Sequence, residues 1–290
     1  MNANDVKTIC VVGAGLMGHQ IAANAAIHGY ETFCTDISQE MLESADSFVN
    51  DYLPGRVEKG KLSGEAARKA RERLHFTPDL EEAAAGADFV IEAVVEKLEV
   101  KRSLFTKLDA ACPPHTILAS NSSYIVSSKI AGATERPGKV LNMHFFNPAL
   151  VMEIVEVVHG PHTSQDTVDA TMELSRRMGK TPVLIRKEIY GFIVNRIVDA
   201  INREAFFLAE QGIATPEDID IAVEGGLNHP MGPFRLVDLI GIDLNYFAHS
   251  EHYKETGDPL DAPSPLIVEK YKKGEFGRKT GKGFYTYEQA

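Results

Sequence analysis

Two side chains that can exchange a proton lie inside apolar runs of this chain. His144 stands within the run 141–146, and Glu156 stands within the run 154–158. A buried carboxylate without a partner is costly, and a turn at 147–148 would place His144 on a strand beside Glu156. A carboxylate on one ring nitrogen fixes the tautomer, and the other nitrogen can then take a proton from a hydroxyl group. The alternative interpretation is a core histidine beside an unrelated glutamate.

The first half of the chain alternates short apolar runs with helical segments, which is typical of a mostly parallel, doubly wound α/β sheet. The predicted strands cover 8–12, 31–35, 89–94, 116–119, 140–145, 152–158 and 182–186. The predicted helices lie near 16–28, 39–53, 64–74, 97–111, 125–131 and 164–179. We expect the helices 39–53 and 64–74 to project as a helical hairpin insertion, with Pro54-Gly55 interrupting its first arm.

A glycine-rich turn follows the first predicted strand. Gly13, Gly15 and Gly18 belong to the run Gly-Ala-Gly-Leu-Met-Gly, which opens a helix of small residues. Gly13 permits a tight turn, Gly15 lets backbone N–H groups approach a pyrophosphate, and Gly18 lets the helix pack closely on the sheet. The helix N-terminus adds partial positive charge for the phosphates. The run therefore predicts a dinucleotide site, which also includes Leu16 and Met17.

Asp36 ends the next predicted strand, 23 positions after the first glycine. A carboxylate there accepts hydrogen bonds from the adenosine ribose and repels a 2′-phosphate, so NAD is favoured over NADP. The motif itself does not separate NAD from FAD. Flavin enzymes with this motif usually have longer chains, so a length of 290 residues favours NAD.

Polar side chains follow two further predicted strands. The segment 120–123 (Ser-Asn-Ser-Ser) comes after one strand, and Glu92 and Glu96 end another. Ligands lie off the carboxyl ends of strands in an open α/β sheet, so we expect these groups to face the cofactor. Glu92 and Glu96 either reach the nicotinamide ribose or cap the next helix, and Ser123 also fits a helix cap.

Composition argues against several classes of protein. A net charge of −11 disfavours a nucleic-acid partner. No segment approaches the roughly 20 uninterrupted apolar residues of a membrane span, and the N-terminus lacks the features of a signal peptide. Cys10, Cys34 and Cys112 indicate neither a disulfide framework nor a metal site. We therefore expect a cytoplasmic protein without a metal and without a membrane partner.

One stretch runs against the acidic balance. Seven basic and three acidic residues lie between positions 56 and 73. They fit a solvated helical face with alternating charges. They equally fit a landing site for a polyanionic substrate handle, such as the phosphates of coenzyme A, with Arg56 and Lys59 as candidate contacts.

The character of the chain changes beyond about residue 187. One long helix is predicted over 191–211, Thr215-Pro216 starts another, and further helices are expected at 233–249 and 263–273. We therefore predict two domains, 1–187 of Rossmann type and 188–290 all-helical. A helical domain this small often completes its core against a twin subunit, which predicts a homodimer.

These pieces together resemble the L-3-hydroxyacyl-CoA dehydrogenase family, particularly its short, single-function members that act on 3-hydroxybutyryl-CoA. The matches span nearly the whole chain in the family's order. They are 13–18, 90–96, 120–123, 144–148, 155–157, 191–196 (Gly-Phe-Ile-Val-Asn-Arg), 229–233 (His-Pro-Met-Gly-Pro) and 281–285 (Gly-Lys-Gly-Phe-Tyr).

The resemblance implies roles for particular residues. His144 would be the catalytic base and Glu156 its orienting partner, while Ser123 and Asn195 would donate hydrogen bonds to the substrate. The positions at which the family contacts NAD include Glu96, Lys101, Ser123 and Asn147. The resemblance also implies an acyl-CoA substrate, a role in fatty acid metabolism (β-oxidation and butanoate metabolism), and a homodimer held by the helical domain.

Three positions depart from the family pattern. Ser122 stands where the family usually has Thr, which keeps the hydroxyl group. Tyr190 replaces a proline of the interdomain hinge, and Tyr124 replaces an aliphatic residue. These departures bear on acyl-chain preference rather than on the chemistry.

We therefore predict an NAD-dependent, reversible oxidation of (S)-3-hydroxyacyl-CoA, in particular 3-hydroxybutyryl-CoA, to 3-oxoacyl-CoA. A dehydrogenase of a free hydroxy acid, a sugar acid or carnitine on the same scaffold is one alternative. A non-catalytic NAD-binding structural or sensor protein is another, and the presence of both His144 and Glu156 speaks against it.

Overall fold

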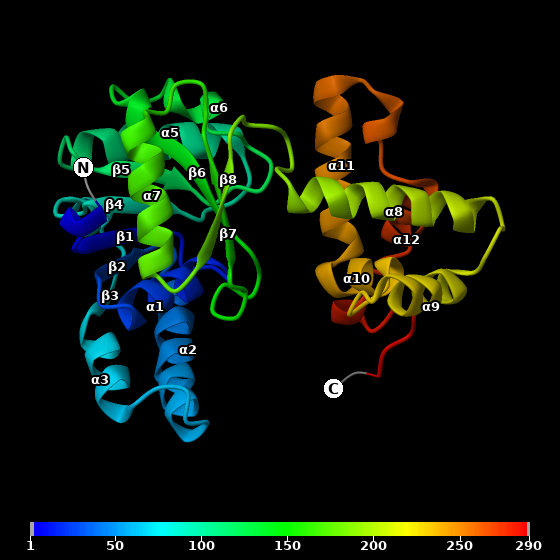
Figure 1. Ribbon diagram of the computed structural model, residues 1–290, viewed down its shortest axis with the longest axis horizontal. Coiled ribbons are helices and arrows are strands. Elements are labelled where there is room, and N and C mark those ends of the chain that lie inside the picture. Colours follow the sequence, from blue (N-terminus) through cyan, green and yellow to red (C-terminus); the bar gives the residue numbers. More distant parts are fainter. Residues whose placement is uncertain (1–2, 289–290) are drawn as a thin grey trace. The chain divides into compact units, whose positions relative to one another are not determined.

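The structure, a computed structural model, describes residues 3–288 of the chain (Figure 1). Contacts between residues divide the chain into two units, and the division falls between Phe192 and Ile193. The predicted boundary, between 187 and 188, falls shortly before this point. The first unit contains an eight-stranded sheet, and the second unit is built from helices. The predicted fold class is confirmed.

The sheet has the strand order β3-β2-β1-β4-β5-β6-β7-β8, and every neighbouring pair is parallel except β6 and β7. Its strands are β1 (Thr8–Val12), β2 (Glu31–Thr35), β3 (Leu74–Thr77), β4 (Phe89–Glu92), β5 (Ile117–Ser120), β6 (Val140–Phe145), β7 (Ile154–Val158) and β8 (Thr181–Ile185). The strand order reverses between β1 and β4. An open α/β sheet binds its ligands at the carboxyl ends of the strands beside such a reversal.

Helices cover both faces of this sheet (Figure 1). They are α1 (Gly18–Ile27), α2 (Gln39–Glu58), α3 (Gly64–Glu72), α4 (Leu80–Ala84), α5 (Leu98–Ala111), α6 (Ser128–Ala131) and α7 (Gln165–Arg177), with short 3₁₀ turns at Ala3–Asp5 and Pro137–Lys139. Side chains of β1 alternate between the two layers. Ile9 and Val11 belong to one core with α1 and α7, and Cys10 and Val12 to the other with α4 and α5.

The α2–α3 hairpin projects from the sheet as predicted (Figure 1), but its first arm is continuous. The prediction that Pro54-Gly55 interrupts this helix is wrong, because α2 runs on to Glu58. Proline removes one backbone hydrogen bond. Leu42, Val49 and Leu53 form a buried stripe at helical spacing, and this packing holds α2 together across the proline.

Two short elements of the first unit escape the sequence pattern. The four residues of β3 were expected to be the end of a helix or a loop, and they become a strand by pairing in register with β2 at the sheet edge. The five residues of α4 are capped by Asp79, whose side chain accepts hydrogen bonds from two backbone N–H groups. Both elements depend on tertiary contacts or a single cap, which periodicity does not report.

The second unit packs five helices around aromatic side chains. They are α8 (Val194–Glu210), α9 (Pro216–Leu227), α10 (Pro233–Ile240), α11 (Ile242–Thr256) and α12 (Pro265–Lys272), with 3₁₀ turns at Pro259–Asp261 and Arg278–Thr280. The ring of Phe234 lies 5.5 Å from that of Phe206 and 4.8 Å from that of Phe284. Thr215 caps α9 as predicted, since its side chain accepts a hydrogen bond from the Asp218 N–H.

The helix predicted over 233–249 is two helices. Gly241 separates α10 from α11 with a φ of 117°, a conformation that an α-helix does not contain. A Cβ at this position would lie 2.8 Å from Asp243 Oδ1. The break follows from backbone geometry that the apolar pattern of the segment does not reveal.

Candidate active site

His144 and Glu156 face each other across the antiparallel pair β6–β7. They are register partners, and His144 Nδ1 lies 2.8 Å from Glu156 Oε2. Both side chains are buried, with exposed fractions of 5% and 1%. The predicted contact between the two side chains is confirmed. The only antiparallel pairing in the sheet therefore brings together two groups that lie twelve positions apart in the sequence.

Two phenylalanine rings surround the imidazole. Phe146 lies 4.6 Å from the His144 ring, edge-on, and Phe192 lies 5.5 Å from it. Phe192 is buried and has a φ of 53°, a conformation that non-glycine residues rarely adopt. An apolar enclosure lowers the local dielectric, which strengthens the interaction between the imidazole and the carboxylate.

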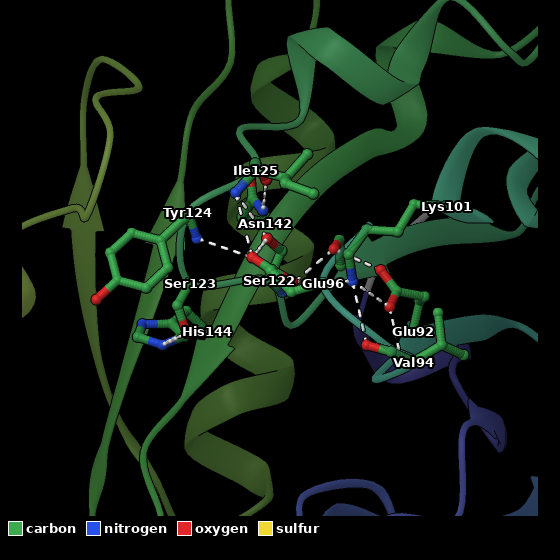
Figure 2. Close-up of polar contacts among 11 residues, drawn as sticks. Glu92, Val94, Glu96, Lys101, Ser122, Ser123, Tyr124, Ile125, Asn142 and His144 are labelled. Atoms are coloured by element: carbon green, nitrogen blue, oxygen red, sulfur yellow. Dashed lines mark hydrogen bonds and ion pairs between the residues drawn. The ribbon is translucent and has the colours of Figure 1, made fainter. Parts of the chain in front are cut away.

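The second ring nitrogen faces a hydroxyl group. Ser123 Oγ lies 3.0 Å from His144 Nε2 (Figure 2). When Nδ1–H donates to Glu156, Nε2 carries a lone pair and accepts from the Ser123 hydroxyl. Glu156, His144 and Ser123 thus form a chain of contacts. Glu156 orients the imidazole through Nδ1, and the proton acceptor Nε2 faces Ser123.

Glu92, Glu96 and Lys101 form a group at the carboxyl end of β4 (Figure 2). Lys101 Nζ lies 2.6 Å from Glu92 Oε1 and 3.3 Å from Glu96 Oε2. Glu92 and Lys101 are buried, whereas the Glu96 side chain is 39% exposed. Glu92 neither contacts a ribose nor caps the next helix. Its side chain is 0% exposed, and its carboxylate accepts hydrogen bonds from Lys101, the Val94 N–H and the Ser120 hydroxyl.

The glycine-rich turn has the shape that a dinucleotide requires. Gly13 has a φ of 104°, and a Cβ on Gly18 would lie 1.7 Å from the Gly13 carbonyl oxygen. A Cβ on Gly15 would instead point into open space. Glycine at position 18 lets α1 pack this closely on the turn. Glycine at position 15 leaves the space beside the turn open for a pyrophosphate. The N-cap of α1 is Met17, and no side chain caps the first turn of this helix with a hydrogen bond.

Asp36 lies beside this turn, at the end of β2. Its Oδ2 accepts a hydrogen bond from the Ala14 N–H at 2.8 Å, and its Oδ1 accepts one from the Ser38 N–H at 2.9 Å. A carboxylate has about four lone-pair sites, so each oxygen retains capacity for a ribose hydroxyl. The residues present therefore fit NAD. Sequence reasoning missed Ile37, whose fully exposed side chain offers an apolar surface immediately after Asp36.

His19 is a second residue near the turn that the motif did not indicate. Its Nδ1 lies 3.3 Å from the Ala14 carbonyl oxygen. Burial lowers the pKa of His19, while hydrogen bonds to the backbone of Ala14 and Gly15 act in the opposite direction. The backbone N–H groups and the helix dipole of α1 supply the attraction for phosphate.

The other predicted site residues are Asn147, Asn195, Arg56 and Lys59. Asn147 is exposed, just after β6, and Asn195 is partly buried in the first turn of α8 in the second unit. Arg56 lies in the last turn of α2 and Lys59 caps its end, so both belong to the projecting hairpin. In the sheet, β3 beside this hairpin is five strands away from β6. Their predicted contacts with NAD and substrate stay predictions.

The described residues add two general findings. Within 3–288, no helix has both the length and the apolar character to cross a membrane. Over the same residues, no group of three or more His, Cys, Asp or Glu side chains is placed to hold a metal ion. Together, the doubly wound sheet, the glycine-rich turn with Asp36, and the oriented imidazole define an NAD-dependent dehydrogenase.

Comparison with known proteins makes this class specific. Residues 8–189 match the family model for the NAD-binding domain of 3-hydroxyacyl-CoA dehydrogenase, and residues 191–287 match its C-terminal domain. The chain therefore belongs to the 3-hydroxyacyl-CoA dehydrogenase family. The predicted family, the cofactor NAD and the dehydrogenase activity are confirmed.

Individual relatives agree over nearly their full length. The chain is 40% identical to a probable 3-hydroxybutyryl-CoA dehydrogenase of Bacillus subtilis, over 98% of this chain and 99% of the relative. It is 38% identical to the mitochondrial hydroxyacyl-coenzyme A dehydrogenase of Homo sapiens, over 98% and 92%. The crystal structure of (S)-3-hydroxybutyryl-CoA dehydrogenase from Ralstonia eutropha matches with a TM-score of 0.92 at 36% identity, over 98% and 100%.

Proposed function

We propose that the chain oxidises short (S)-3-hydroxyacyl-CoA esters, in particular 3-hydroxybutyryl-CoA, reversibly to 3-oxoacyl-CoA. The observation that carries this proposal is the chain of contacts Glu156–His144–Ser123, which presents an oriented ring nitrogen beside a hydroxyl group. Relatives of 40% and 36% identity that are named for 3-hydroxybutyryl-CoA support the short acyl chain.

In this proposal His144 Nε2 takes the proton of the substrate hydroxyl. Glu156 stabilises the imidazolium that forms and keeps the ring oriented. Ser123 holds the substrate oxygen near Nε2, and Asn195 donates a second hydrogen bond to it. NAD, when bound, would supply the acceptor for the hydride that leaves C3 of the substrate. In the reverse direction, the imidazolium returns its proton to the new alkoxide oxygen.

The cofactor would be held at the carboxyl ends of strands β1, β2 and β4. The backbone of the glycine-rich turn would bind the pyrophosphate, and Asp36 would bind the adenosine ribose. The exposed side chains of Leu16 and Ile37 support an adenine site on this edge. Residues that complete the proposed cofactor site are Met17, Glu96, Lys101, Ser123 and Asn147.

The hairpin α2–α3 would bind the phosphates of coenzyme A. Arg56 and Lys59 lie near its tip, and they supply charges that suit a polyanion in an otherwise acidic protein. Arg56→Glu with Lys59→Glu should raise KM for acetoacetyl-CoA while leaving the NADH dissociation constant unchanged. An unchanged KM would assign the basic stretch to solvation alone.

The second unit would form a homodimer. Its single chain exposes large apolar side chains on several helices, including Phe207, Ile221, Leu227, Leu239, Leu244 and Phe247. Exposed apolar surface of this kind marks an association site. Light scattering should give twice the mass of the chain, and a monomer at micromolar concentration would exclude the dimer.

We also place the enzyme in the cytoplasm. Its three cysteines are free and buried, which suits a reducing compartment. Detection of the protein in a membrane or secreted fraction of its cell would contradict this placement.

A steady-state series tests the proposed function. NADH oxidation is followed with 3-oxoacyl-CoA substrates of four to sixteen carbons and, in parallel, with free 3-oxo acids. The proposal predicts the highest kcat/KM for acetoacetyl-CoA. Preference for a free acid would support the alternative dehydrogenase on this scaffold. NADH binding without turnover of any substrate would support the non-catalytic alternative.

A further inference from the structure

A buried ammonium group lies at the carboxyl end of β4, outside the His144–Glu156 pair. The Lys101 side chain is 1% exposed, and its Nζ lies 2.6 Å from Glu92 Oε1 and 3.3 Å from Glu96 Oε2. A third acceptor, the Val94 carbonyl oxygen, lies at 3.5 Å. A lysine ammonium has three donors, and three acceptors surround this one.

Glu92 fixes this ammonium group in place. Its Oε1 accepts hydrogen bonds from Lys101 and, at 2.8 Å, from the Val94 N–H, and its Oε2 accepts one from Ser120 Oγ at 2.6 Å. The Glu92 side chain is 0% exposed. A buried, fully hydrogen-bonded pair of this kind has one arrangement, which makes it a rigid base for whatever it contacts next.

Glu96 transmits this fixed position to the loop after β5. While Oε2 pairs with Lys101, Oε1 accepts hydrogen bonds from Ser122 Oγ, from the Tyr124 N–H at 3.1 Å and from the Ile125 N–H at 3.4 Å (Figure 2). Ser122 Oγ also accepts from the Ile125 N–H at 2.7 Å. One carboxylate oxygen thus holds the residues on both sides of Ser123.

The far end of the loop is held from β6. Asn142 donates from Nδ2 to the Ile125 carbonyl oxygen at 3.0 Å and accepts the Ser127 N–H at 2.7 Å. Ser123 therefore lies in a segment that is anchored on both sides, and its Oγ reaches His144 Nε2 at 3.0 Å. The start of the loop is also held, because the Phe145 N–H donates to Asn121 Oδ1 at 2.8 Å and the Ser122 N–H donates to Ser120 Oγ at 3.2 Å.

We propose that Lys101, acting through Glu96 and Ser122, is a positioning residue that sets Ser123 against His144. Lys101 then contributes to the reaction through the loop, in addition to its proposed place in the cofactor site. This inference rests on the proposed function, because the place of Ser123 affects the rate only if the substrate hydroxyl reacts at His144. It also gives a reason for a hydroxyl residue at position 122, whether Ser or Thr.

Ser122 offers a sharp test, because removing its hydroxyl changes neither a charge nor the core. We expect Ser122→Ala to lower kcat about 10- to 100-fold, the size of effect that a misplacement of about 1 Å produces. Ser122→Thr should restore kcat to within about 3-fold of wild type, because the hydroxyl returns. The NADH dissociation constant, measured by fluorescence titration, should stay within about 3-fold in both variants, since positioning leaves uniform binding intact.

Lys101 is tested in a form that keeps the buried charges balanced. Lys101→Met alone would leave the Glu92 carboxylate buried and unpaired, which endangers folding. The double variant Lys101→Met with Glu92→Gln removes both charges, and we expect it to show the same fall in kcat. Lys107→Met is the matched control, because Lys107 is an exposed lysine on the same helix α5. Ser103→Ala, also exposed on α5, controls for loss of a hydroxyl.

The outcomes separate this inference from the proposed function. Full turnover in Ser122→Ala overturns the inference, and so does a weakening of NADH binding as large as the fall in kcat, which would indicate direct cofactor contact. Crystal structures of Ser122→Ala and Ser122→Thr give a readout that needs no turnover: the distance from Ser123 Oγ to His144 Nε2 should lengthen in the first and be retained in the second. If wild type turns over no acyl-CoA, the proposed function fails, and this distance still decides the inference.

Discussion

The two units bury their acidic side chains in different ways. In the first unit, Glu156 contacts an imidazole and Glu92 contacts an ammonium group, both of which can carry a proton. In the second unit, Asp238 is 1% exposed and accepts hydrogen bonds from the N–H groups of Phe284 and Tyr285 and from the Tyr287 phenol. An imidazole or ammonium partner can take part in proton transfer or charge stabilisation. Backbone N–H and phenol donors instead hold a loop in place.

Asp220 repeats the second pattern, with the Arg235 guanidinium 3.8 Å away as an additional partner. It accepts from the N–H groups of Phe234 and Arg235 at the start of α10 and from the Tyr285 phenol at 2.7 Å. A Cβ on Gly232 would lie 2.4 Å from this carboxylate, and one on Gly283 would lie 2.0 Å from Asp238 Oδ1. The glycines of the segments 229–233 and 281–285 therefore serve the packing of the second unit, although both segments carried the family resemblance.

The largest effect is expected at the imidazole itself. His144→Gln should lower kcat for NADH oxidation by acetoacetyl-CoA about 10²- to 10⁴-fold, because the proton acceptor is lost. The dissociation constant of NADH should be nearly unchanged. Turnover close to wild type would show that His144 is not the proton acceptor. The buried Glu156–His144 pair would then be structural, like the buried aspartates of the second unit.

Glu156→Gln should have the next largest effect. The amide keeps the size of the side chain but neither stabilises an imidazolium nor fixes the tautomer, so we expect kcat to fall about 10²-fold. Thermal unfolding should change little in comparison. A variant that loses stability but keeps its kcat when folded would move Glu156 into the structural class of Asp238.

Asp36 sharpens the comparison, because it lies in the first unit and is held by backbone N–H groups. Asp36→Ala should narrow the preference for NAD over NADP by about 10-fold or more, since a repulsive charge near the 2′-phosphate disappears. The ratio of kcat/KM for the two cofactors measures this. An unaltered ratio would mean that Asp36 only holds the turn.

Asp238→Asn tests the structural class. The amide replaces an acceptor with a donor that faces N–H and O–H groups, so the free energy of unfolding should fall by about 1–3 kcal/mol. Chemical denaturation measures the loss, and kcat per folded molecule should stay within about 3-fold of wild type. A large fall in kcat with unchanged stability would give this aspartate a role in the reaction.

The cysteines of the first unit are the smallest test. Burial raises the pKa of Cys34 to about 12 and that of Cys112 to about 11, and burial also raises the pKa of Cys10. The neutral thiols stabilise the folded state below pH 9, and this contribution is lost as the pH rises further, because the unfolded thiols ionise first. At pH 8, iodoacetamide should label the native protein slowly and the unfolded protein at all three cysteines. Rapid native labelling would contradict the burial.

Strong local patterns made much of the first unit predictable. The bounds of β1, β2 and β6 follow apolar runs, and the glycine-rich turn follows from its spacing. The contact between His144 and Glu156 followed from one physical requirement, that a carboxylate in a buried run needs a partner. These features are local or depend on a single strong cost.

Features that depend on several weak contacts were not predictable. The edge strand β3 exists through its pairing with β2, and the break at Gly241 through a backbone angle. Lys101 was expected to contact NAD, and its burial between Glu92 and Glu96 depends on how α5 packs against β4. Lysine is seldom buried, and no sequence pattern predicts the burial of a particular lysine.

One measurement tests most directly whether Glu156 acts through His144. In the double-mutant cycle of Glu156→Gln and His144→Gln, kcat with acetoacetyl-CoA is compared across wild type, both single variants and the double variant. If Glu156 acts through His144, Glu156→Gln should lower kcat about 10²-fold in wild type and less than about 3-fold when His144 is already absent. Equal losses in both backgrounds would show that the two residues act independently and would contradict the proposed pair.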